Sequence, residues 1–306
     1  DVRRSCQTIA LNTGFPVARS QTSVVSRWLV MPMAAISAVP PPAFSIAARQ
    51  VAAVVDHEAG SVATLADDFS VSLTAGAVAN AGELALVNKA LGATTGAVTG
   101  TISGAAATLA PLSTTATNGL TISVTDAEAA PVSASDLKAV GLATSGTATV
   151  ANKVAISGNI ADATAALVTS GSKVVLGTAD TPVTVSGAVT AKEGAAIAMV
   201  TNAAASFATG VVDALGNLSS GGTINSNLTA IKNDQSDVAI AINDADNFSA
   251  AAADMKVVGS ATTGTVTVTN QAAISGNIAD VTAALITDAS KVVLSKASTA
   301  TVADAV

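Results

Sequence analysis

The sequence predicts an α/β repeat solenoid over residues 61–306, built from stacked coils of about 27 residues. Each coil is expected to contain one short strand of a parallel sheet and one short helix. Three observations predict this fold: a long internal duplication, strands with period-two alternation, and helix start signals between those strands. A right-handed parallel β-helix is the alternative, and it predicts strands rather than helices in segments such as 159–168.

The duplication is the strongest of these observations. Residues 136–176 and 254–294 align without a gap at an offset of 118 residues, and 29 of their 41 positions are identical. Such identity indicates internal duplication, and a shorter period of about 27 residues lies inside it. Candidate strands begin near Phe69, Ala97, Leu120, Thr147, Lys173, Ser206, Asp237, Thr265 and Lys291.

The candidate strands alternate between aliphatic and polar positions. Val266 and Val268, for example, alternate with Thr265, Thr267 and Thr269. Because successive side chains of a strand point to opposite faces, one face of the sheet is expected to be aliphatic and the other rich in threonine.

Short helices are expected between the strands, because capping residues recur there. A capping box pairs an N-cap side chain with an acid three residues later, which satisfies free backbone N–H groups at the helix start. The candidate pairs are Asn80/Glu83, Ser133/Asp136, Asn159/Asp162, Thr190/Glu193 and Asn277/Asp280. After the helices, Gly96, Gly146 and Gly264 are expected to form left-handed C-terminal caps.

Residues 1–60 differ from the rest of the chain. They contain the only Trp, Cys and His and five of the eight prolines. The apolar stretch from Trp28 to Val39 follows Arg27 and resembles a short signal-peptide core. We therefore expect 1–60 to be a poorly structured leader or a targeting remnant. No membrane span is predicted, because the apolar stretches are too short or are interrupted by polar residues.

The charge distribution argues against a nucleic-acid partner. Residues 1–60 contain five arginines and three acids, whereas residues 61–306 contain nine lysines and 18 acids and no arginine. An acidic surface offers no basic stripe to contact phosphates. A single histidine, His57, and a single cysteine, Cys6, exclude histidine-rich or thiolate zinc sites and leave no full catalytic triad in residues 61–306.

One loop is a candidate metal site. In the segment 243–247, Asp244 and Asp246 alternate with other residues and could supply carboxylate oxygens to Ca²⁺. The loop lacks the glycine and the distal glutamate of an EF-hand, so turn formation and helix capping are the competing interpretation. No other cofactor is predicted.

Threonine pairs such as Thr99/Thr101 and Thr265/Thr267 raise the further possibility of an ice-binding face. The coils near Lys173 and Asp237 interrupt that array, and the ordinary preference of threonine for strands also explains the pairs. A β-solenoid polysaccharide-active enzyme is a remote alternative, and it would need acids aligned on adjacent coils.

The repeat units resemble those of a known class of proteins. The segments ATTGAVTGTISGAAATLAPL (93–112), ATSGTATV (143–150) and ATTGTVTV (261–268) are similar to repeats of giant bacterial cell-surface and secreted proteins of the marine cyanobacterial type, which are adhesin-like or surface-layer-like. The resemblance covers about residues 65–306 and implies a structural role; it assigns no functional residue.

These observations together predict a non-enzymatic structural or adhesive repeat segment of a larger extracellular or cell-surface bacterial protein. Its expected partners are neighbouring repeats or copies of itself, and cell-surface polysaccharide. A calcium- or glycan-binding module is the alternative function.

Overall fold

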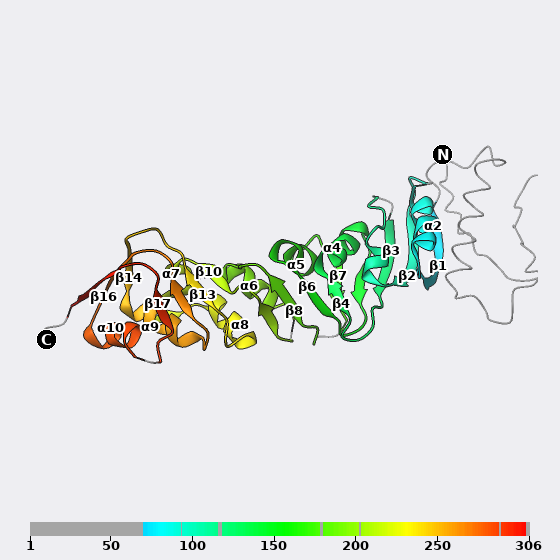
Figure 1. Cartoon of the computed structure of the whole chain (residues 1–306). Coiled ribbons are helices and arrows are strands. Elements are labelled where there is room, and N and C mark those ends of the chain that lie inside the picture. Colours follow the sequence, from blue (N-terminus) through cyan, green and yellow to red (C-terminus); the bar gives the residue numbers. More distant parts are fainter. Residues whose placement is uncertain are drawn as a thin grey trace, which may run out of the picture. The chain divides into compact units, whose positions relative to one another are not determined.

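The computed structural model describes residues 70–92, 94–115, 118–177, 180–201, 203–287 and 289–303 (Figure 1). The expected leader and the boundary between residues 60 and 61 lie outside these ranges. The chain divides into two compact units, one containing residues up to 123 with 143–147, and the other containing 124–142 with 148–306.

The first unit consists of strand–helix repeats. Its elements are β1 (Val71–Ala77), α2 (Ala81–Gly92), β2 (Val98–Gly104), α3 (Ala106–Leu109) and β3 (Asn118–Val124). Strands β1 and β2 are parallel, and Val71 pairs with Val98, one coil later. Along β2, Val98 and Ile102 are buried whereas Thr99 and Thr101 are exposed, which confirms the predicted alternation.

In the second unit, most helices are preceded by two short strands instead of one. Its elements are β4 (Pro131–Ser133), α4 (Ala134–Ala143), β5 (Ala148–Val150), β6 (Ala155–Asn159), α5 (Ile160–Leu167), β7 (Val174–Leu176), β8 (Val183–Ser186), α6 (Ala191–Ala198), β9 (Ala205–Phe207), β10 (Val211–Asp213), α7 (Leu215–Leu218), β11 (Ser219–Ser220), β12 (Thr223–Ile224), α8 (Ser226–Asp234), β13 (Ile240–Ile242), β14 (Phe248–Ala251), α9 (Ala252–Ala261), β15 (Val266–Val268), β16 (Ala272–Gly276), α10 (Ile278–Leu285), β17 (Val292–Leu294) and β18 (Thr299–Val302).

The prediction of one strand per coil is wrong for this unit. In the later coils, the first of the two strands (β13, β15 and β17) lies with β10 in the sheet β10-β13-β15-β17. The second strand of a coil lies in the sheet β4-β6-β8-β9 or in the sheet β14-β16-β18. All neighbouring strands in these sheets are parallel. In register, Ile240 pairs with Val266, which pairs with Val292, so each coil advances the chain by 26 residues. The second strand was missed because it runs directly into the helix cap without a turn signal.

The strand expected near Ser206 exists, but it belongs to the other kind of sheet. It is β9, and it pairs with β8 rather than continuing the sheet of first strands. The following strand, β10, begins the sheet that contains β13. Between β10 and β13, strands β11 and β12 form a short antiparallel hairpin, in which Ser219 pairs with Ile224. This hairpin interrupts the regular coil pattern between the two copies of the duplicated segment.

The helices confirm one prediction against its alternative. Segment 159–168, where a pure β-helix requires strand, contains helix α5. The side chain of Asn159 accepts a hydrogen bond from the backbone N–H of Asp162, and Asn277 does the same for Asp280 at the start of α10. Over the described residues the parallel sheets remain separate sheets, and no closed solenoid is seen.

The prediction for the glycines that follow the helices is wrong. Gly146 and Gly264 do not have positive φ angles. At both positions the backbone of the preceding coil passes too close to leave room for a side chain. A Cβ on Gly264 would lie 2.3 Å from the carbonyl oxygen of Asp237, and a Cβ on Gly146 would lie 2.4 Å from that of Leu120. The adjacent coil is drawn close by Thr262, whose hydroxyl donates to the carbonyl of Val238 (2.6 Å) and accepts from the Gly264 N–H (2.9 Å).

Candidate functional site: a polar ladder between coils

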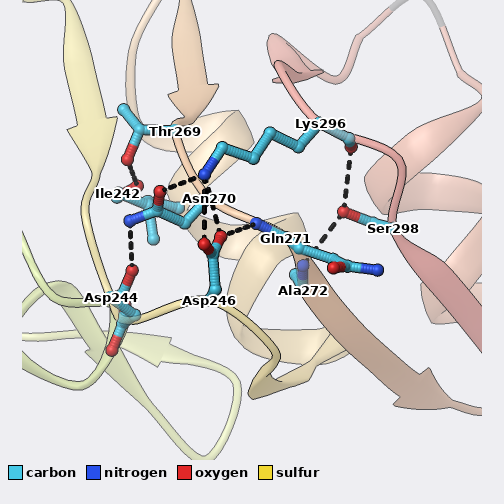
Figure 2. A network of polar contacts seen from close by, with 9 residues as sticks. All are labelled: Ile242, Asp244, Asp246, Thr269, Asn270, Gln271, Ala272, Lys296 and Ser298. Atoms are coloured by element: carbon cyan, nitrogen blue, oxygen red, sulfur yellow. Dashed lines mark hydrogen bonds and ion pairs between the residues drawn. The ribbon is translucent and has the colours of Figure 1, made fainter.

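A network of polar contacts joins three successive coils of the second unit (Figure 2). It lies in the loops that follow β13, β15 and β17. We call it the polar ladder and define it as Asp244, Asp246, Thr269, Asn270, Gln271, Lys296 and Ser298. It includes both residues of the predicted calcium site, so its geometry decides what those carboxylates contact.

The first two coils are joined by side chains that bind the backbone of the preceding coil. The hydroxyl of Thr269 donates to the carbonyl of Ile242 (2.9 Å), and the amide Nδ2 of Asn270 donates to the carbonyl of Asp244 (2.6 Å). These partners are 27 and 26 residues apart, which is the length of one coil. Each loop therefore holds the loop before it through a repeated short contact.

The third coil adds a charge to the ladder. The Nζ of Lys296 lies 2.9 Å and 3.3 Å from the two carboxylate oxygens of Asp246, and 3.0 Å from Oδ1 of Asn270. The N–H of Gln271 donates to the same Asp246 carboxylate (3.1 Å). The hydrogen bond from Lys296, followed by that from Gln271, lowers the pKa of Asp246 below its usual value. Asp246 is therefore an ionised acceptor at neutral pH.

The structure places the two predicted calcium ligands on different partners. Oδ2 of Asp244 accepts a hydrogen bond from the N–H of Leu215 (2.7 Å), at the start of α7, whereas Asp246 faces Lys296. Among the residues that the structure describes, no three or more His, Cys, Asp and Glu side chains are grouped so that they could hold a metal ion. Both carboxylates therefore form contacts with other coils, at separations of 25 to 50 residues along the chain.

Two further ion pairs join helices of adjacent coils. Lys138 on α4 contacts Asp162 at the start of α5 (2.8 Å), and Lys256 on α9 makes the equivalent contact with Asp280 at the start of α10 (2.5 Å). The hydrogen bonds from these lysines are the main reason why the pKa values of Asp162 and Asp280 are lowered. The two pairs are related by the 118-residue offset, so the duplication preserves the bracing contact.

Another pair of side chains covers the edge of β9. Oδ2 of Asp234 accepts from the N–H of Ala205 (3.2 Å), and Oε1 of Gln235 accepts from the N–H of Phe207 (2.7 Å). Burial raises the pKa of Asp234, and the Ala205 N–H partly opposes that effect. Because a free edge strand exposes unpaired N–H groups, these two side chains at the end of α8 replace a neighbouring strand.

The other predicted sites are placed as follows. His57 and Cys6 lie outside the described residues. Thr267 lies between Ala241 and Val293 in the sheet register, so threonine does not form a continuous array in that sheet. In the part of the chain that is described, no helix is long and apolar enough to cross a membrane.

Sequence reasoning missed Asn270 and Lys296. A signal was nevertheless present: Asn152, which aligns with Asn270 at the 118-residue offset, donates to the carbonyl of Asp126 (2.7 Å), the counterpart of Asp244. An asparagine at one-coil spacing after each acidic loop therefore marked the ladder. The contact made by Lys296 could not be predicted from the duplication, because the equivalent residue of the first copy is Thr178.

Comparison of the chain with protein-family models, curated proteins and solved structures found no match.

Proposed function

We propose that this chain is a non-enzymatic structural or adhesive repeat segment of a larger extracellular or cell-surface bacterial protein, in which the coils stack into a solenoid. The observation that carries the proposal is the use of polar side chains as contacts between consecutive coils, in both copies of the duplicated segment. Neighbouring repeats, copies of the chain and cell-surface polysaccharide are the partners that suit such a role.

The contacts between coils recur at the repeat spacing. The hydroxyl of Thr262 reaches back 24 residues to Val238, Asn270 reaches back 26 residues to Asp244, and Lys256 reaches forward 24 residues to Asp280. In a repeat array, stability is close to a sum of the stability of each repeat and of each interface between neighbours. Contacts of this kind raise the interface contribution, which supports a mechanical rather than a chemical role.

The core supports the same role. The buried side chains are mostly Ala, Val, Leu and Ile, with threonine hydroxyls at the coil junctions. Phe207 is 1% exposed and so belongs to this core, which removes one of the few aromatic rings on which a sugar could stack. A glycan-binding function would need to recognise its ligand through polar contacts instead.

Small-angle X-ray scattering of the full chain tests the stacked arrangement. A continuous solenoid gives an elongated particle whose cross-section is that of one coil, because each repeat contacts only its neighbours. A compact globular scattering profile would overturn the proposal. Sedimentation velocity on the same sample provides an independent frictional ratio and excludes aggregation as the cause of an extended profile.

Calcium titration separates the structural role from the alternative of a calcium module. We expect no heat of binding in calorimetry, because the Asp244 and Asp246 carboxylates already accept hydrogen bonds from protein groups. The matched controls are D244N and, at the equivalent position of the first copy, D126N. Binding heat that D244N abolishes and D126N leaves intact would favour the calcium module over the structural segment.

A further inference from the structure

The two copies of the duplicated segment differ in what lies beside them. In the first copy, helix α5 packs against the next helix, α6, and strand β8 pairs with the next strand, β9. In the second copy, the equivalent elements are helix α10 and strand β18, and no later helix or strand occurs in the described residues. The first copy therefore shows what covers such a coil, namely another coil of the same kind.

Strand β18 exposes side-chain positions that are buried in β8. The register aligns the two strands, because Gly158 pairs with Val185 and the equivalent Gly276 pairs with Val302. Val185 is fully buried, whereas Val302 is 37% exposed. Val185 has Phe207 of β9 as its neighbour in the sheet, and β18 is the last strand of its own sheet. The exposure of Val302 therefore reflects the lack of a covering coil in the described residues.

Helix α10 adds exposed apolar residues to the same end of the coil stack. Ile278 and Ile286, at the two ends of α10, are 49% and 72% exposed, whereas the equivalent Ile160 and Val168 of α5 are partly buried. Helix α10 contacts β18, so these isoleucines and Val302 belong to one surface. We call α10 and β18 the end face. Soluble proteins rarely leave several large apolar side chains exposed together unless they mark an interaction site.

The backbone of β18 is oriented for pairing with a further strand. The N–H of Ala303 donates to the carbonyl of Gly276 on β16. Because backbone groups alternate in direction along a strand, the N–H and carbonyl of Val302 point away from β16. In the first copy, the carbonyl at the equivalent position, that of Val185, accepts from the N–H of Ala208. The outer edge of β18 therefore offers the hydrogen-bonding groups that β8 uses to bind β9.

The chain protects one sheet edge with side chains, and β18 lacks the residues for such protection. At β9, Asp234 and Gln235 accept hydrogen bonds from the edge N–H groups. Strand β18 has the sequence TATV, without a charge, a glycine or a proline. Threonine and valine favour strands, and an uncharged edge strand is a template for pairing with another chain.

We propose that two copies of this chain dimerise through their end faces. The β18 strands pair antiparallel across a two-fold axis, because such an axis reverses the strand direction, and the outward backbone groups of each strand bind those of the other. Ile286 of each α10 is buried in the same interface. The occupant is a second copy because the first copy of the duplicated segment is itself covered by a coil of this chain. The inference rests on the proposed stacking of coils.

Sedimentation equilibrium of the full chain over a range of concentrations tests the dimer. We expect a limiting mass of two chains, because a two-fold interface closes on itself. I286D places a charge in the interface, and A300P removes an outward N–H of β18 while the bonds to β16 remain. Each should weaken the dimer by about tenfold or more. M199D is the matched control, since Met199 is a 78% exposed apolar residue at the end of α6 and should leave the dimer unchanged.

Three results would overturn the dimer: a chain that stays monomeric at the highest concentration, association beyond two chains, and a dimer that I286D leaves as strong as M199D does. Circular dichroism identifies a variant that fails to fold, and I286D changes only an exposed side chain, so it keeps the test decisive if A300P unfolds. Scattering of the same samples separates this inference from the proposed function. An elongated monomer would remove the dimer alone, whereas a compact particle would contradict the stacked repeat segment itself.

Discussion

Removal of the buried hydroxyl of Thr262 tests how the coils are held together. The substitution T262V preserves the shape of the side chain and deletes only the oxygen. Thr262 is 5% exposed, and its hydroxyl donates to the carbonyl of Val238 and accepts from the N–H of Gly264. The variant leaves both backbone groups without that partner at the junction between two coils.

The expected cost follows from those two groups. A buried polar group that loses its partner costs about 1–3 kcal/mol. The Gly264 N–H is partly exposed, so water can replace its hydrogen bond, whereas the Val238 carbonyl faces the coil junction. We therefore expect a loss of about 2 kcal/mol, or roughly a thirtyfold change in the folding equilibrium.

The neighbouring threonine is the matched control. Thr263 is exposed, and its hydroxyl lies 3.4 Å from the carbonyl of Ser236, which also accepts the Thr263 backbone N–H. T263V should change the stability by less than about 0.5 kcal/mol. Urea unfolding followed by circular dichroism compares the two variants, and hydrogen exchange of the Gly264 amide localises the effect. If T262V unfolds at the same urea concentration as T263V, the hydroxyl does not hold the coils together.

Three further predictions concern single positions in the second unit. G264A should destabilise the protein by about 1–3 kcal/mol or more in urea unfolding, because its Cβ would lie 2.3 Å from a backbone oxygen, whereas G171A, with nothing within 4 Å, should not. N277A should cost about 1 kcal/mol by loss of the α10 cap; an unchanged melting temperature would contradict the capping role. The pKa of Asp280 is lowered mainly by the hydrogen bond from Lys256. The stability that this pairing contributes is present above the ordinary carboxyl pKa of about 4, and it is lost as the pH falls through the lower pKa that Asp280 has in the folded protein. The melting temperature of K256Q should therefore fall less steeply in acid than that of the wild type; parallel curves would refute the pairing.

The helix starts were predictable because they depend on local residues. Asn159, Thr190 and Asn277 each cap a helix as predicted, and Thr190 and Glu193 form the full reciprocal box. Ser133 differs, since its hydroxyl accepts from the N–H of Ser135 instead of that of Asp136. A capping bond spans only three residues, so the spacing in the sequence nearly fixes its geometry.

The first strands and their buried faces were predictable for a related reason. Period-two alternation is a property of a single strand, and Val266 and Val268 are buried on either side of Thr267 as the pattern indicates. The second strands were not predictable, because segments such as 155–159 run directly into a helix cap and become strands only by pairing with an adjacent coil. The stacking register supplies that pairing, and the sequence of one coil does not contain it.

The repeat itself was therefore determined by the sequence: the duplication and the coil length follow from comparing segments of the chain, and the alternating strands and capped helices are short-range patterns. The tertiary structure alone decided that each regular coil of the second unit has two strands, that Gly264 serves close approach rather than a left-handed turn, and that Lys296 meets Asp246 across 50 residues. The physical reason is that these features depend on which residues of neighbouring coils come into register. That register is fixed by the packing of whole coils, so no local window of the chain specifies it.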